Sequence, residues 1–118
     1  MLLRIDPASE VSLFAQVAAS IRSDAASGRL RPGDRLPAAR EVAGALGINV
    51  HTVLHAYQEL RDEGLLDMRR GRGAVVTDAA GDLASLRDQV AQLVRSARAK
   101  GVSPDVLAAL VKEFTHDD

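Results

Sequence analysis

The chain has 118 residues, a net charge of −1, 47% hydrophobic residues and 3% aromatic residues. This composition excludes a disordered chain and predicts a folded domain with an aliphatic core, while the balanced charge gives no overall sign of nucleic-acid binding. Because the chain has no cysteine, no signal peptide and no run of roughly 18 apolar residues, we expect a cytoplasmic protein without thiolate metal sites or membrane spans.

The first predicted helix covers residues 11–27 and follows an extended lead-in that ends at Pro7. Apolar residues at helical spacing mark its buried face: Leu13, Phe14, Val17, Ile21 and Ala25. Gly28 ends this helix, and Pro32-Gly33 is typical of a turn.

Two further helices are predicted between residues 37 and 63. Pro37 is expected to open the second helix, because the missing N–H of proline costs nothing in the first helical position. This helix runs to about Leu46 and is broken by Gly47. Asn49 is predicted to cap a third helix that runs to about Glu63.

A β-hairpin is predicted next, with strands at 65–68 and 74–77. Residues 78–82 are predicted to be a linker. A fourth helix at about 83–99 ends at Gly101, and a fifth begins with Ser103 as its cap and Pro104 in its first position.

This order of elements predicts a mainly α fold with a small β-hairpin, a winged helix-turn-helix. We assign residues 1–77 to a winged helix-turn-helix DNA-binding domain. Residues 78–118 form the linker and a two-helix dimerisation segment.

The third helix carries the candidate base-reading residues. Its buried stripe is Val53, Ala56, Tyr57 and Leu60. Its outer face begins with side chains that form hydrogen bonds and carry little negative charge: Asn49, His51, Thr52 and His55. Such a face suits base edges in a major groove, and Leu54 beside it suits a thymine methyl group. The alternatives are a solvated face, or a metal site at His51 and His55, which have no further ligands nearby.

The hairpin tip concentrates positive charge in the candidate phosphate-binding residues Arg69, Arg70, Gly71 and Arg72. Guanidinium groups bind phosphates and glycines keep the tip slim, as a wing on DNA requires. The alternative is a solvated charged turn. Arg40, in the first turn of the second helix, is a further candidate, with a surface pair to Asp34 or Glu41 as its alternative.

No nucleophile, base and orienting group come together in this arrangement, so we expect no catalytic site, no cofactor and no metal, and therefore no enzyme. Two apolar stripes in the last two helices predict dimerisation: Leu86, Val90 and Leu93 in the fourth, and Val106, Leu110 and Phe114 in the fifth. The alternative is that these helices pack back on their own domain.

Residues 11–77 resemble the DNA-binding domain of the GntR family of bacterial regulators. The ordered motifs are G-x-L-x-P-G-x-x-L-P, R-E-x-A, L-G, T-V-x-x-A-Y-x-x-L, E-G-L and G-R-G. The lead-in LRIDPASEVSLFAQV, the N-x-x-T-V-x-x-A-Y form of the third helix and the tail of about 40 residues are similar to the YtrA subfamily.

This resemblance implies DNA contacts from the second helix, the third-helix start and the wing tip, at Arg40, Asn49, His51, Thr52, Arg70, Gly71 and Arg72. Two departures matter. Ala38 stands where many members have serine, so a possible phosphate-binding hydroxyl is missing. Val50 stands where many members outside the subfamily have arginine, which weakens the transfer of a detailed base code. Larger relatives carry an effector-binding domain, for which this length leaves no room, so the resemblance implies that the last two helices mainly dimerise. No effector ligand is identified.

We therefore expect a homodimeric transcriptional regulator, more specifically a repressor, whose partner is double-stranded DNA with an inverted-repeat operator. The alternative is a winged-helix protein-interaction module without DNA binding, which would need neither the arginine-rich tip nor the polar helix face.

Overall fold

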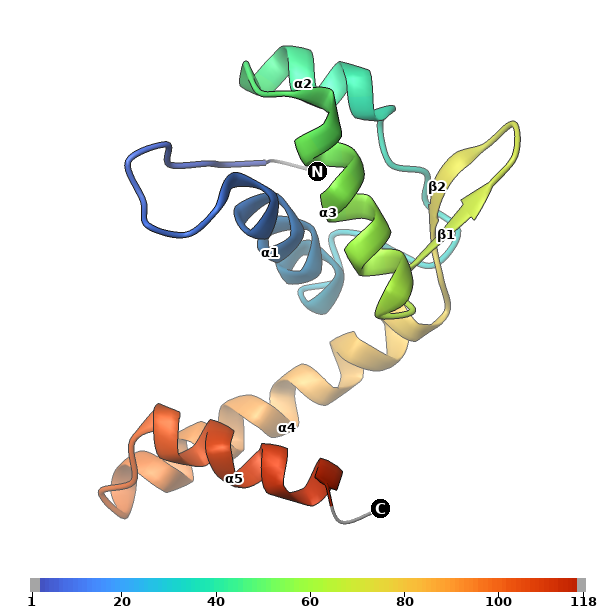
Figure 1. Ribbon diagram of the computed structural model, residues 1–118. Coiled ribbons are helices and arrows are strands. Elements are labelled where there is room, and N and C mark those ends of the chain that lie inside the picture. Colours follow the sequence, from blue (N-terminus) through green and yellow to red (C-terminus); the bar gives the residue numbers. More distant parts are fainter. Residues whose placement is uncertain (1–2, 117–118) are drawn as a thin grey trace. The chain divides into compact units, whose positions relative to one another are not determined.

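The computed structural model of the chain describes residues 3–116 (Figure 1). Its elements are α1 (Leu13–Ala26), α2 (Ala39–Leu46), α3 (Val50–Asp62), β1 (Leu66–Arg69), β2 (Gly73–Val76), α4 (Ala79–Ala99) and α5 (Pro104–His116). The predicted fold class, mainly α with a small β-hairpin, is confirmed. The chain divides into two compact units, one up to Ser85 and one from Leu86 onward.

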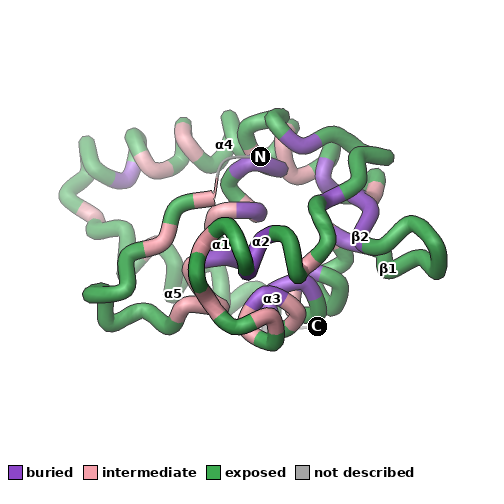
Figure 2. The backbone as a smooth tube through the Cα atoms, turned by 90° about the horizontal axis from the view of Figure 1, so that it is seen from above, coloured by how far each residue is buried: buried purple, intermediate pink, exposed green. Residues whose placement is uncertain are grey.

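Helix α3 is the centre of the first unit, with α1 and α2 packed against it (Figure 1). The largest fully buried side chains are Val17 and Ile21 of α1 and Val53 and Leu60 of α3. The buried residues of this unit form one continuous core. Figure 2 marks the buried positions of the chain in purple. The predicted inward stripe of α3 is therefore confirmed, and its opposite face is left at the surface.

The start of α3 follows the prediction, whereas the start of α2 does not. The side-chain oxygen of Asn49 accepts a hydrogen bond from the backbone N–H of His51 at 2.8 Å, which caps α3. Helix α2 begins at Ala39 with Ala38 at the N-cap, so the expectation that Pro37 occupies the first helical position is wrong. The reason is that Leu36 still pairs with β2, and the residue before a proline favours extended backbone.

The β-hairpin, residues 66–76, is called the wing below. Its strands pair antiparallel from Leu66 opposite Val76 to Arg69 opposite Gly73, each strand within one residue of its predicted bounds. The other edge of β2 pairs with the segment 33–36, where Arg35 lies opposite Val75. The wing is thus held from both sides of its second strand.

The predicted linker at 78–82 is wrong, because α4 begins at Ala79 and runs through it. Gly81 suggested a break, and glycine does cost about 1 kcal/mol in a helix. However, Ala80 is almost fully buried and Leu83 packs against the core, so burial of these side chains outweighs the cost. The first compact unit consequently extends eight residues beyond the expected boundary at 77, to Ser85.

The second unit contains the rest of α4 and α5. The turn between them follows the prediction: Gly101 has a φ of +78°, and the backbone N–H of Val102 donates to the carbonyl of Ala97 at 2.8 Å. Ser103 caps α5 by accepting a hydrogen bond from the N–H of Val106 at 3.2 Å. Pro104 is the first residue of α5, as expected.

Candidate nucleic-acid interface

The four polar residues predicted for the start of α3 lie together. Asn49, His51, Thr52 and His55 border one surface hollow of about 430 Å³, whose other wall is the start of α1. The oxygen of Asn49 is occupied by the helix cap, so its side-chain amide N–H groups remain as donors. The N-terminal end of α3 therefore presents a cluster of hydrogen-bonding groups at the surface.

The ring of His55 is stacked on Phe14 of α1. The two ring centroids are 3.9 Å apart and the rings are inclined by 18°. Sequence reasoning placed Phe14 on the buried face and His55 on the outer face, and the structure instead brings both to the seam between α1 and α3. This packing accounts for His55 without DNA, so a role of His55 in DNA contact stays a prediction.

The arginines of the wing tip differ in their surroundings. Arg69 forms an ion pair with Asp67, with 3.0 Å between Nε and Oδ2, and both side chains are about half exposed. Arg70 and Arg72 are exposed and have no ion pair within the described residues. Gly71 has a φ of +81°, in the left-handed region that favours glycine, which permits the tight tip.

Sequence reasoning missed Arg35, which precedes the helix-turn-helix by several residues. Its Nε donates a hydrogen bond to the carbonyl oxygen of Arg72 at 3.1 Å, across 37 positions of the sequence. In the sequence, Arg35 lies between the turn at Pro32-Gly33 and Leu36. Nothing in this local pattern predicts that the segment pairs with β2.

A groove of about 340 Å³ separates α3 from the wing and is called the wing groove below. Leu54 of α3, Met68 of β1 and Ala74 of β2 supply apolar surface, and Arg35 and Arg72 supply positive charge. Leu54 is half-buried, in agreement with its expected place near the exposed side of α3. Met68, 38% exposed, was not predicted as part of this surface.

Arg40 is the second residue of α2 and is exposed, as predicted. Its suggested alternative was a pair with Asp34 or Glu41, and among residues 3–116 it has neither pair. Arg40 lines neither the hollow beside α1 nor the wing groove. Its role in phosphate binding stays a prediction.

Two interactions hold α3 in place beneath these groups. Arg22 of α1 binds Glu63 through two hydrogen bonds of 2.9 and 2.7 Å, and this hydrogen bonding raises the pKa of Arg22. The Tyr57 hydroxyl donates to the carbonyl of Pro37 at 2.8 Å. Burial raises the pKa of Tyr57 to about 12, with a further contribution from the negative charge of Glu41.

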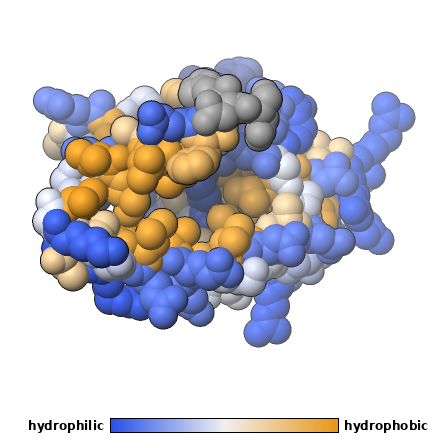
Figure 3. Space-filling view, turned by 90° about the horizontal axis from the view of Figure 1, so that it is seen from below, coloured by the Kyte–Doolittle hydropathy of each residue, from blue (hydrophilic) through white to orange (hydrophobic). Residues whose placement is uncertain are grey.

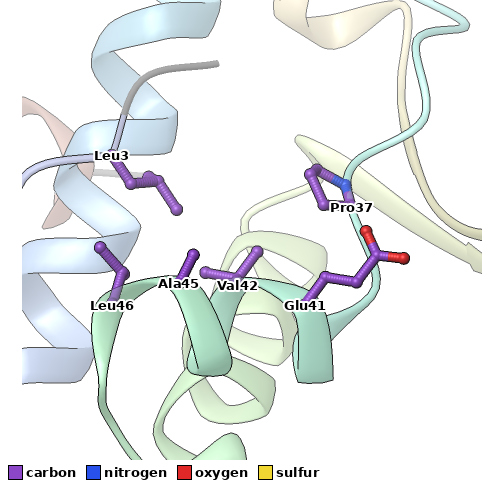
Figure 4. Close-up of a pocket in the computed structure, with 6 residues that line it drawn as sticks. All are labelled: Leu3, Pro37, Glu41, Val42, Ala45 and Leu46. Carbon is purple, nitrogen blue, oxygen red and sulfur yellow. The ribbon is translucent and has the colours of Figure 1, made fainter.

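A further pocket of about 300 Å³ lies between the lead-in and α2 (Figure 4). Leu3 faces Val42, Ala45 and Leu46 across it, and Glu41 supplies one carboxylate near Pro37. No group of three or more potential metal ligands occurs within residues 3–116. None of the helices described there is long and apolar enough to span a membrane.

The residues predicted for dimerisation are exposed on the second unit. Leu86, Val90 and Leu93 of α4 are 47–56% exposed. Leu110 and Phe114 of α5 are 46% and 69% exposed. Figure 3 shows hydrophobic residues at the surface on the side of the molecule seen from below.

Comparison with known proteins identifies relatives over almost the whole chain. The HTH-type transcriptional repressor YtrA of Bacillus subtilis is 32% identical, over 98% of this chain and 94% of the relative. The HTH-type transcriptional regulator Rv1152 of Mycobacterium tuberculosis is also 32% identical, over 86% of this chain and 84% of the relative.

The chain is also similar to solved structures of transcription regulators. YtrA from Sulfolobus acidocaldarius, a GntR-family transcription factor, is 34% identical with a TM-score of 0.62, covering 84% of this chain and 99% of that one. AraR(DBD) in complex with operator ORX1 is 31% identical with a TM-score of 0.56, covering 64% of this chain and 93% of that one.

The family model described as bacterial regulatory proteins, gntR family, matches residues 13–76, which include α1, α2, α3 and the wing. This match covers more than half of the chain and coincides with the elements that carry the candidate interface. The chain belongs to the GntR family of bacterial regulatory proteins.

Proposed function

We propose that this protein is a homodimeric transcriptional repressor that binds an inverted-repeat operator. Each subunit inserts the start of α3 into the major groove and lays the wing along the adjacent minor groove. The observation that carries the proposal is that one face of α3 offers both kinds of contact. Its start presents hydrogen-bonding side chains at the surface. Its Leu54 borders the groove that leads to the wing tip, where Arg72 has no ion pair among residues 3–116.

The side chains of α3 and of the wing tip are suited to two different kinds of DNA contact: reading the bases and binding the backbone. His51 and Thr52 offer side chains that bind base edges, whereas Arg70 and Arg72 offer positive charges that bind phosphates of any sequence. A protein-interaction module would require neither set. The relatives named as transcriptional regulators, and AraR(DBD) in complex with its operator, support DNA as the partner.

The second unit supports a dimer. Its exposed aliphatic and aromatic residues form stripes on α4 and α5, and such stripes are normally covered by a partner. A twofold dimer presents two copies of α3 to two half-sites, which explains why the operator would be an inverted repeat.

The test is selection of duplexes from a random library by the full-length protein, followed by footprinting of the selected DNA. We expect two protected half-sites with centres about one helical turn, roughly 34–36 Å, or a multiple of it apart. As a matched comparison, the variant carrying both Arg70→Ala and Arg72→Ala should bind the same duplex more weakly. Failure to enrich any duplex would refute the proposal and favour the interaction module.

A further inference from the structure

Arg35 is fixed at the edge of the wing by its backbone. The segment 33–36 is extended and pairs with β2: the N–H of Leu36 donates to the carbonyl of Ala74, and the N–H of Val76 donates to the carbonyl of Asp34. Successive side chains of an extended segment point to opposite sides. Because Leu36 is buried, Arg35 points to the exposed side.

The guanidinium group of Arg35 is only partly used within the chain. Its Nε donates to the carbonyl of Arg72 at 3.1 Å, and this is its one side-chain hydrogen bond among residues 3–116. None of the ion pairs found in that range includes it. Its two terminal amino groups therefore keep donors for a ligand, and its positive charge has no carboxylate partner.

The wing groove matches the chemistry of one DNA strand. A strand alternates apolar deoxyribose with charged phosphate, and the groove is lined by the apolar Leu54 and Met68 and by the positively charged Arg35 and Arg72. The major and minor grooves of a duplex are separated by a sugar–phosphate backbone. A protein that places α3 in the major groove and the wing in the minor groove must let that backbone pass between them.

We propose that the wing groove seats the backbone of one DNA strand and that Arg35 binds a phosphate there. The same guanidinium holds the wing tip through its bond to Arg72, so Arg35 both positions the wing and contacts DNA. This inference rests on the DNA binding proposed above and adds a contact outside the helix-turn-helix and the wing tip.

The first test is the salt dependence of binding to a duplex selected by the wild-type protein. Each phosphate contact contributes about 0.9 to the slope of log affinity against log salt. We expect Arg35→Ala to lower the slope by about this amount, and Arg35→Lys, which keeps the charge, to retain it. Arg61→Ala is the control, because Arg61 is exposed in the last turn of α3 and paired with Asp62.

The second test separates phosphate contact from any effect on folding. Phosphates of the selected duplex are replaced one at a time by neutral methylphosphonates, and affinity is measured for the wild type, Arg35→Ala and Arg61→Ala. One replacement should weaken the wild type and the control but leave Arg35→Ala unaffected. The inference is overturned if Arg35→Ala keeps the wild-type slope, or if it loses affinity at every position where the wild type does. A wild-type protein that selects no duplex overturns the proposed function as well.

Discussion

Tyr57 joins the core to the segment that leads into α2. Its side chain lies in the buried stripe of α3, and its hydroxyl donates to the carbonyl of Pro37. Ionisation would place a negative charge in this apolar surrounding, next to a carbonyl oxygen that needs a donor. Burial therefore raises the pKa of Tyr57 from its ordinary value of 10.0 to about 12.

This pKa predicts that the protein loses part of its stability at alkaline pH. The folded protein holds the phenol proton more tightly than the unfolded chain, so the contribution is complete below pH 10 and is lost between pH 10 and about 12. The loss in the free energy of unfolding is about 2–3 kcal/mol. Tyr57 is the only tyrosine and the chain has no tryptophan, so phenolate absorbance follows this group alone.

Tyr57→Phe is the control for this prediction. It removes the titration and costs about 1 kcal/mol at neutral pH through the lost hydrogen bond. The wild type should therefore be about 1 kcal/mol more stable than Tyr57→Phe at neutral pH, and it should become the less stable of the two as the pH rises from 10 to 12. Parallel curves for the two proteins across this range would contradict the assignment.

His51 is the residue at which base reading is tested most directly. It is exposed in the first turn of α3, where its side chain does not contribute to the cap. His51→Ala should cost about 1–3 kcal/mol in binding a selected operator and much less in binding random DNA. Gel shifts on both DNAs measure this difference.

Gln58→Ala is a suitable control for His51. Gln58 is exposed on the same helix about two turns later, so its loss should leave operator affinity unchanged. Equal losses for His51→Ala on operator and random DNA would make His51 a backbone contact instead.

At the scale of single residues, the sequence predicted correctly those residues whose interactions are with near neighbours in the chain. The Asn49 cap acts across two residues, and the buried stripe of α3 follows from helical periodicity. The stack of His55 on Phe14 and the bond from Arg35 to Arg72 connect positions far apart in the chain. Neither periodicity nor spacing predicts such contacts, because they depend on how complete elements pack.

At the scale of elements, the wing is a paired hairpin with an exposed, positively charged tip. Its strands pair with each other and with segment 33–36, while Arg70 and Arg72 extend into solvent. Arg69 differs, because it forms an ion pair with Asp67. An exposed ion pair contributes at most about 1 kcal/mol to stability, so a phosphate can readily replace Asp67 as the partner of Arg69.

The wing therefore predicts a sequence-independent contribution to binding. Changing both Arg70 and Arg72 to alanine should weaken binding to operator and random DNA alike. It should also reduce the salt slope by about one unit for each lost phosphate contact. Titrations at several salt concentrations measure the slope, with Arg61→Ala as the control; an unchanged slope would remove the wing from the DNA interface.

Element boundaries were predicted within one or two residues wherever a capping or turn residue fixes them, as at Ser103 and Asn49. The fourth helix shows where this reasoning fails. Gly81 and the short polar segment around it favour a linker, yet Ala80 and Leu83 bury against a core assembled from other elements. Burial of those side chains is a tertiary effect, so the local sequence underestimates the helix by four residues at its start.

For the whole molecule, the central question is what covers the second unit. Half-exposed aliphatic residues on α4 and a 69% exposed Phe114 on α5 leave apolar surface open. Burying a side chain of this kind completely is worth about 1.5–3 kcal/mol, so several together can stabilise a dimer. Dimerisation also determines operator affinity, because binding at one half-site makes the second binding event intramolecular.

Val90→Asp tests this arrangement in the full-length protein. The new carboxylate would lie in the apolar stripe of α4, where a dimer interface would have to bury it without a partner, so the variant should be a folded monomer. Its affinity for the two-half-site operator should fall by several orders of magnitude, while weak binding to a single half-site persists. Sedimentation equilibrium and paired gel shifts measure both effects.

Gln92→Asp adds the same charge at an exposed polar position of the same helix and should remain dimeric. If Val90→Asp stays dimeric and binds the operator normally, the interface lies elsewhere, with α1 as the next surface to test.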